Sequence, residues 1–156
     1  MKLTSLLGII AAVLLFWITF PGGGGKEAAR RTVCLSNTKQ QALALEMYRE
    51  GTDGRFPDRD HWMDAIEPFV KDSKYVLHVP GPWRANAPGV YGYAFNSTLS
   101  RTAQPKDPEK VAIVYDSSNP IRNASDPETS LPNPGRHDGK NHIACVDGHA
   151  KAVEMK

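Results

Sequence analysis

The sequence predicts an α+β fold in which an N-terminal transmembrane helix is followed by a long amphipathic helix packed on a small antiparallel β-sheet. Three observations lead to this prediction. An apolar segment near the start is long enough to cross a membrane. The next segment has apolar residues at helical spacing. The later part holds short segments of strand-forming residues, and the last two are joined by a hairpin signal.

The apolar segment spans residues 3–20 and contains no charged side chain. Eighteen helical residues rise about 27 Å, close to the roughly 30 Å of a hydrocarbon core. We therefore assign residues 1–20 to a transmembrane anchor, with the membrane as a partner through residues 3–20. A cleaved secretory signal is the alternative, although its apolar region usually spans only about 7–15 residues.

A break separates this anchor from the rest of the chain. Pro21 and the glycines at 22–25 interrupt a helix, so residues 21–25 are predicted to form a hinge. Residues 26–156 then form one domain, large enough for a single hydrophobic core. Its first element is a helix that begins near Lys26 and ends near Gly51. Five residues share the face predicted to be buried, namely Cys34, Thr38, Ala42, Leu45 and Tyr48.

The middle of the domain has weaker signals. Asp58 or Asp60 is predicted to cap a short helix, and residues 74–79 alternate weakly in the manner of a strand. Residues 91–95 and 110–115 are clearer strands, rich in aromatic and β-branched side chains. The polar, proline-rich segment 117–136 is a long loop that is either functional or loosely ordered. The inward side of the short helix is predicted to hold Trp62, Ala65, Ile66 and Phe69.

The last two strands are predicted to meet in a two-residue turn at Asp147 and Gly148, with positive φ at both residues. This turn would place Cys145 opposite Ala150 and Ile143 opposite Ala152. We therefore expect these four small apolar residues to share the sheet face that lies on the long helix.

Composition excludes some functions. The formal net charge of +2 and the lack of a basic stripe with interleaved aromatic residues argue against a nucleic-acid partner. The sequence also lacks a Gly-x-Ser-x-Gly elbow, a His-Glu-x-x-His helix and a phosphate-binding loop. We therefore expect no catalytic residues and no enzymatic activity.

Five potential metal ligands lie within thirteen residues near the C-terminus: His137, Asp138, His142, Asp147 and His149. They could hold a transition metal. The preferred interpretation assigns no metal, because Asp147 is already explained by the preference of a hairpin turn for Asp-Gly. In that interpretation His137 bonds the backbone near the Asp-Gly turn. Cys34 and Cys145 are candidates for a disulfide outside the cytoplasm, and the alternative is that both are small buried apolar residues.

His137 and Asp147-Gly148, separated by nine residues, resemble the H-X9-DG signature of pilin-like, pseudopilin-related bacterial proteins. Together the matching motifs cover residues 26–155. Other motifs of that family have similar counterparts here: CLSNTKQQALALEMY at 34–48, DGRFPD at 53–58, YGYAFN at 91–96 and VAIVYDSS at 111–118.

The resemblance implies a type IV pilin-like fold, anchored by one pass in the inner membrane with its domain on the extracytoplasmic side. It implies a structural role in a type II secretion or type IV pilus-like assembly, with other pilin-like subunits as partners. The positive-inside rule alone, applied to Lys26, Arg30 and Arg31, would favour the cytoplasm weakly. The alternative function is an anchored binding module that does not polymerise and uses loop 117–136.

The resemblance also bears on processing and on calcium. The family carries a Phe-Thr-Leu-Ile-Glu processing motif, and this sequence has Thr4 and Ser5 where the glutamate would stand, so we expect different processing or assembly. Major pseudopilins bind calcium in a C-terminal loop. The corresponding loop here offers oxygen ligands on five residues, namely the candidates Asp116 and Asp126 together with Ser117, Asn119 and Asn123.

Overall fold

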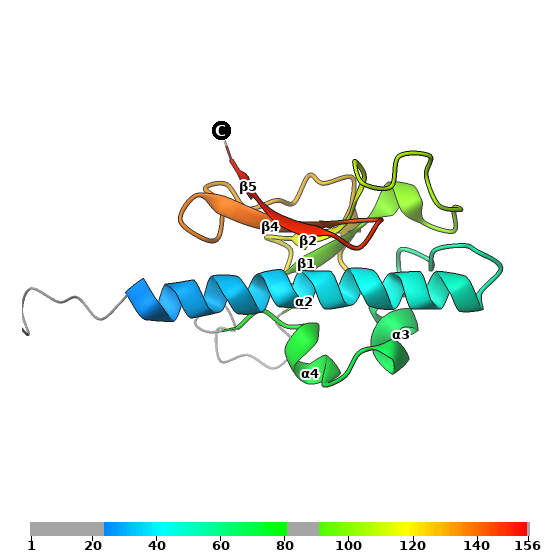
Figure 1. Ribbon diagram of the computed structural model, residues 1–156, viewed down its shortest axis with the longest axis horizontal. Coiled ribbons are helices and arrows are strands. Elements are labelled where there is room, and N and C mark those ends of the chain that lie inside the picture. Colours follow the sequence, from blue (N-terminus) through cyan, green and yellow to red (C-terminus); the bar gives the residue numbers. More distant parts are fainter. Residues whose placement is uncertain (1–23, 81–90, 156) are drawn as a thin grey trace, which may run out of the picture.

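A 28-residue helix, α2 (Gly24–Gly51), lies along one face of a five-stranded sheet (Figure 1). The computed structural model describes residues 24–80 and 91–155. The predicted anchor and the first part of the hinge lie outside these residues. Within the described ranges, no helix combines the length and apolarity needed to cross a bilayer. Gly24 and Gly25 belong to α2, so the prediction that they form part of a hinge is wrong.

The α+β prediction is confirmed, but the sheet is mixed rather than antiparallel. Its strand order is β3-β1-β2-β4-β5, and β3 pairs with β1 in parallel while the other neighbours are antiparallel. The short β3 lies inside the segment predicted to be a loop. The strands are β1 (Tyr93–Asn96), β2 (Ala112–Asp116), β3 (Ser125–Asp126), β4 (Lys140–Cys145) and β5 (Ala150–Glu154).

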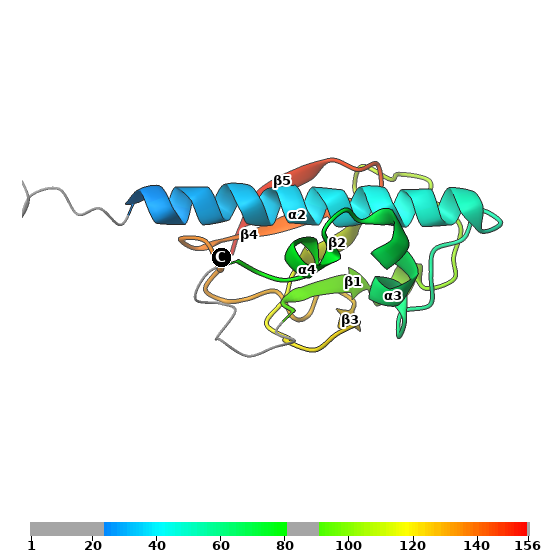
Figure 2. The same cartoon turned by 90° about the horizontal axis from the view of Figure 1, so that it is seen from below.

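Two short helices complete the layer that covers one face of the sheet. They are α3 (Trp62–Ile66), which continues into a 3-10 turn at Glu67–Phe69, and α4 (Ser73–Val76). Seen from below, α2 crosses β4 while α3 lies beside β1 (Figure 2). Trp62 anchors α3 there, because its ring stacks on Phe95 and its indole N–H donates to the Ala124 carbonyl at 2.9 Å.

The predicted buried face of α2 is largely confirmed. Cys34, Thr38, Ala42 and Leu45 are fully buried, whereas Tyr48 is half-buried. The main core of the domain lies between these residues, α3 and the strands. A second, smaller apolar cluster lies on the other face of the sheet, formed by Ala94, Ala112, Tyr115, Ala124 and Ile143.

The weak strand predicted at residues 74–79 is wrong, because most of this segment lies in α4 and its end. Two buried amides of α2 hold the segment in place. Asn37 Nδ2 donates to the Tyr75 carbonyl at 3.0 Å, and Gln41 Nε2 donates to the Val76 carbonyl at 2.7 Å. Bonds from a neighbouring helix therefore outweigh a marginal strand propensity.

The predicted details of α3 are partly wrong. Met63 is buried while Phe69 is 40% exposed, and the chain turns into the 3-10 segment before Phe69 could reach the core. His61 occupies the N-cap position without a side-chain cap. Asp58 instead accepts the Asp60 N–H at 2.8 Å, closing a local turn before the helix.

The hairpin is present, but its predicted register is wrong by one residue. Ala144 pairs with Ala150, and His142 pairs with Ala152. The loop has three residues rather than two, since Cys145 accepts the Gly148 N–H at 2.9 Å and donates to the His149 carbonyl at 2.8 Å. Such a loop needs positive φ only at its glycine, and Gly148 has φ of 84°.

This shift of one residue exchanges the two faces of β4. His142 and Ala144 face α2, whereas Ile143 and Cys145 face the opposite side, where Ile143 joins the smaller cluster. The prediction that Ile143 and Cys145 lie on the long helix is therefore wrong. A histidine enters the interface between helix and sheet instead.

The loop before β4 should be intolerant of any side chain at Gly135. A Cβ there would lie 2.5 Å from the backbone of Gly139 and Lys140. We expect Gly135→Ala to lower the free energy of unfolding by about 1–3 kcal/mol through overpacking, measured by urea denaturation. Gly51→Ala is the control, because a Cβ at Gly51 meets nothing within 4 Å. Equal stabilities of the two variants would contradict this reading.

Candidate functional site

Polar side chains from four segments meet between the first half of α2 and the sheet. Cys34 comes from α2, Asp116 from the end of β2, and His142 from β4, while Arg136 and His137 come from the loop before β4. Four are buried, with Cys34, Asp116 and His137 at zero exposure, and the side chain of Arg136 is 7% exposed. These residues are called the buried polar cluster below.

Asp116 is the centre of the cluster. Its Oδ1 accepts from Arg136 Nη1 at 2.9 Å, and its Oδ2 accepts the backbone N–H of His142 at 2.7 Å. Arg136 also donates to the Gly92 carbonyl at 2.9 Å. A buried carboxylate is costly without such partners, so these bonds are what allow Asp116 to remain charged inside the domain.

His137 links the cluster to the first turn of α2. Its Nδ1 lies 2.9 Å from Glu27 Oε1. Because an ionised carboxylate only accepts, Nδ1 carries a proton and donates it to this bond. The same hydrogen bond lowers the pKa of Glu27 below its ordinary value, although burial opposes this shift.

The other nitrogen of His137 points toward Asp116. His137 Nε2 lies 4.0 Å from Asp116 Oδ2, and His142 Nδ1 lies 3.6 Å from the same oxygen. Neither nitrogen has a hydrogen-bond partner in the described part of the chain. The two rings stack with centroids 4.6 Å apart. Burial lowers the pKa of His142 despite the nearby Asp116, so His142 is neutral near pH 7.

Cys34 closes the cluster on the helix side. Its Sγ, a carboxylate oxygen of Asp116 and a ring nitrogen of His137 all lie within 4.8 Å of one another. Burial and the charge of Asp116 raise the pKa of Cys34 to about 12, and burial raises the pKa of the neighbouring Tyr93 well above its ordinary value. Cys34 is therefore a neutral thiol at pH 7 and not a ready nucleophile.

The disulfide considered between Cys34 and Cys145 is not formed, since both are free and buried. The physical reason is the register of the hairpin. Cys145 faces away from α2, and its neighbours are Lys151, Asp147 and Glu128 rather than the residues around Cys34. Both residues are buried thiols, as in the alternative, but Cys34 lies against the polar groups of the cluster.

The predicted role of His137 is only partly correct. Its backbone pairs with Lys140, and its side chain bonds Glu27 rather than the backbone near the Asp147-Gly148 turn, which lies at the other end of β4. Gly148 also meets α2, because a Cβ on it would lie 3.3 Å from Leu43. His137 and Gly148 thus contact α2 at Glu27 and at Leu43. These two helix positions are sixteen residues apart, about 24 Å along the helix axis.

The other predicted metal ligands do not join the cluster. Asp138 is exposed and pairs with Arg31, whereas Asp147 pairs with His149 at 2.6 Å on the hairpin turn. Each of these acids therefore already has a partner of its own at the surface.

The predicted calcium ligands are likewise separated. Asp116 lies in the buried cluster, but Asp126 Oδ1 accepts the Tyr115 hydroxyl at 2.9 Å and the backbone N–H groups of Thr129 and Ser130. The Asn123 amide donates to Asp64 on α3. These oxygens organise the loop by hydrogen bonds and do not face a common point.

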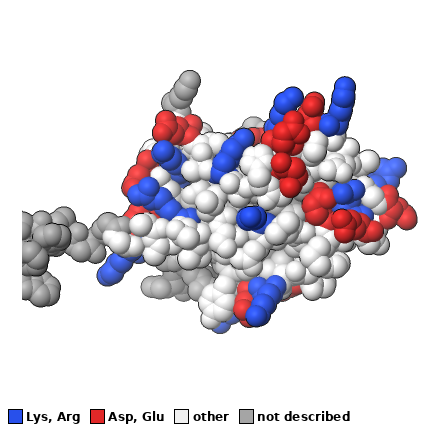
Figure 3. Space-filling view, viewed as in Figure 1, with Lys and Arg blue, Asp and Glu red and all other residues white. Residues whose placement is uncertain are grey.

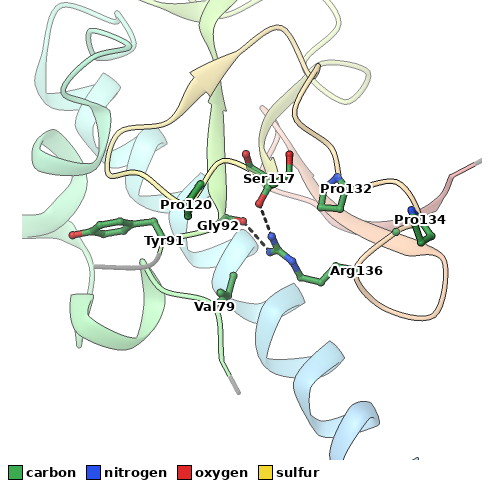
Figure 4. Close-up of a pocket in the computed structure, with 10 residues that line it drawn as sticks. Val79, Tyr91, Gly92, Ser117, Pro120, Pro132, Pro134 and Arg136 are labelled. Carbon is green, nitrogen blue, oxygen red and sulfur yellow. Dashed lines mark hydrogen bonds between the residues drawn. The ribbon is translucent and has the colours of Figure 1, made fainter. Parts of the chain in front are cut away.

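A cavity of about 440 Å³ lies beside the cluster (Figure 4). Its lining is mostly apolar and includes Val79, Tyr91 and three prolines of segment 117–136, which are Pro120, Pro132 and Pro134. Arg136 reaches its edge, but its guanidinium already donates to the Gly92 and Ser117 carbonyls. The cavity therefore suits an apolar group better than an anion.

Sequence reasoning identified His137, His142, Asp116 and Cys34 but assigned them to three different candidate sites, and it missed Glu27. Glu27 lies 110 positions from His137, and no local pattern links the two. A usable signal existed for Asp116, because an acidic residue ends the apolar strand AIVYD. No protein-family model, curated protein or solved structure matches this chain.

His137 should contribute strongly to stability. His137→Ala leaves the buried side of Glu27 without its donor and opens space beside His142. We expect a loss of about 1–3 kcal/mol in the free energy of unfolding, measured with chelator present. His149→Ala, at an exposed histidine that also pairs with an acid, is the control and should change stability by less than about 0.5 kcal/mol. A loss no larger than this control would show that the bond to Glu27 is not structural.

Asp126 should make stability depend on acid. Burial alone would raise the pKa of Asp126, but hydrogen bonds from Ser130 and Tyr115 hold it below the ordinary 3.8. The folded state thus prefers the carboxylate, so this contribution is present above about pH 4 and is lost as the pH falls through the folded pKa. Urea denaturation at about pH 5 and about pH 3 measures the loss.

Asp126→Asn should show a smaller difference between these two pH values than the natural chain. Asp107→Asn, at an exposed acid on another loop, is the control and should keep the full difference. The same acid dependence in the natural chain and in Asp126→Asn would contradict the role assigned to Asp126.

Proposed function

We propose that this chain is a membrane-anchored, pilin-like structural subunit that packs against other pilin-like subunits through α2. One observation carries the proposal. The apolar segment 3–20 is followed almost at once by a 28-residue helix that packs on the sheet and on α3 and α4 and still has an exposed strip along its length. A helix of this kind can hold the domain and still offer a free face for contacts between subunits.

The free face of α2 is apolar where a contact surface would be needed. Val33, Leu43 and Met47 are 44%, 47% and 51% exposed. At 100° per residue their positions fall within an arc of about 80°. In Figure 3 much of the surface along α2 is white, with a blue side chain near its middle and charged side chains toward its ends. Three large apolar side chains on one exposed helix face favour packing against another chain.

Charged residues border this face without dividing it. Ser36 and Gln40 lie within the same arc and are exposed but uncharged. Between positions 33 and 50 the exposed charged residues of α2 are Glu50 and Lys39, which fall about 20° and 40° outside this arc. The proposed location, with the domain on the extracytoplasmic side of the inner membrane, follows from the resemblance described above.

The cavity favours a second candidate, an anchored binding module that does not polymerise. Seven of its ten lining residues belong to segment 117–136, which is expected to recognise a ligand in that reading. Its apolar, proline-rich lining would suit an apolar side chain or a small apolar ligand. This candidate makes no use of the exposed face of α2, so the two proposals predict different results in the same experiment.

Cross-linking in membranes tests the first candidate. We expect Val33→Cys and Met47→Cys to form a ladder of multimers with a bifunctional thiol reagent, because these positions would lie at the subunit contact. The unchanged chain is the background control, since Cys34 and Cys145 are buried. Asp107→Cys, exposed on a loop away from α2, is the matched control for random collisions.

Only monomers at both α2 positions would contradict the subunit proposal and favour the binding module. A ladder of equal strength from Asp107→Cys would show that the multimers come from collisions, and it would also count against a specific contact along α2.

A further inference from the structure

We infer that the buried polar cluster is a site for a divalent transition metal of the zinc type, with Cys34, Asp116 and His137 as ligands and His142 as the fourth. This site is independent of the proposed role as a subunit. It differs from the surface group of acids and histidines that the sequence suggested, because only His137 and His142 belong to both.

The spacing of the candidate ligand atoms supports the site. Two ligands of a tetrahedral zinc ion lie about 3.3–3.8 Å apart, since the bonds measure about 2.0–2.3 Å. The distances from Asp116 Oδ2 to His142 Nδ1 and His137 Nε2 are 3.6 and 4.0 Å. Both are too long for a hydrogen bond and close to the separation of two ligands on one ion. Cys34 Sγ lies within 4.8 Å of Asp116 and His137.

The two histidine nitrogens are the strongest observation. His137 Nε2 and His142 Nδ1 are both buried and have no hydrogen-bond partner among the described residues. Leaving a buried polar atom without a partner costs about 1–3 kcal/mol. Two such atoms that face one carboxylate oxygen are explained together by a cation that accepts both lone pairs.

Glu27 supplies the outer support that metal-bound histidines usually have. Its carboxylate accepts from His137 Nδ1 at 2.9 Å, so Nε2 is the ring nitrogen directed at the cluster. A ligand histidine commonly donates its other ring N–H to a carboxylate in this way, which fixes the tautomer and the orientation of the ring.

The charges and the ligand types also fit. Glu27 and Asp116 carry two negative charges, and Arg30 and Arg136, which pair with them, carry two positive charges. When the metal replaces the thiol proton, which leaves to solvent, a Cys34–metal bond forms and the thiolate adds a negative charge. The carboxylate of Asp116 and this thiolate are then the two anionic ligands of a divalent ion. One thiolate, two imidazoles and one carboxylate suit zinc better than calcium or magnesium, which prefer oxygen ligands.

Bound metal would join α2 through Cys34 and the end of β2 through Asp116. It would also join the loop before β4 through His137 and β4 itself through His142. It would thus act as a structural clamp between the helix and the sheet. Arg136 holds Asp116 Oδ1. Oδ2 accepts the backbone N–H of His142 and has a second lone pair for the metal, so the ion pair, this hydrogen bond and the metal site can exist together.

Cobalt binding tests the inference on the full-length protein purified in the presence of chelator and then freed of it. Co²⁺ is the probe, because a cysteine ligand produces a thiolate-to-cobalt charge-transfer band and a tetrahedral site produces intense visible absorption. We expect one Co²⁺ per chain with both features, and Zn²⁺ should displace it. Cys34→Ser should abolish the charge-transfer band, while Cys145→Ser, at the matched buried thiol, should leave it unchanged.

Glu27→Gln provides a variant that keeps every proposed ligand. We expect it to weaken Co²⁺ binding about 10- to 100-fold, the usual effect of losing an outer-shell carboxylate. It decides the question if Cys34→Ser fails to fold. The inference is overturned if the natural chain gives no charge-transfer band, if Cys34→Ser folds and keeps the band, or if Glu27→Gln binds Co²⁺ as tightly as the natural chain.

Discussion

The arrangement of the domain depends on one buried charge, the carboxylate of Asp116. Asp116 has no exposed surface, and it is tolerated because Arg136 and the backbone N–H of His142 both bond it. These two bonds fix the loop before β4 against the end of β2 and set the position of β4 itself. Removing either donor would leave a charge in the core without full compensation, which is more costly than losing an apolar contact.

Once β4 is positioned by Asp116, both ends of the strand are held against α2. At the start of the strand His137 bonds Glu27 in the first turn of the helix, and at the end the hairpin glycine Gly148 meets Leu43. The arrangement gives the H-X9-DG spacing a physical meaning in this chain. Nine residues between His137 and Asp147 span the strand that must reach from one contact on the helix to the other.

The sequence predicted well those elements whose signal is local. The apolar spacing of α2 identified most of its buried face, and the β-branched and aromatic runs located β1 and β2. Contacts between distant segments decided the rest. The amides of Asn37 and Gln41 turned a weak strand pattern into α4, and a three-residue loop with one positive φ shifted the hairpin by one position. That shift carried His142 toward the helix and Cys145 away from it.

By itself, the sequence determined the fold class, the long helix and the hairpin, and it singled out His137 and His142 of the buried polar cluster. Periodicity, turn residues and composition are local properties, so a sequence pattern can reveal them. Only the tertiary structure decided the strand register, the separation of the two cysteines and the meeting of Cys34, Asp116 and His137. These three residues lie on a helix, a strand end and a loop far apart in the chain. Their proximity arises from packing and from the need to compensate a buried carboxylate, neither of which leaves a pattern in neighbouring residues.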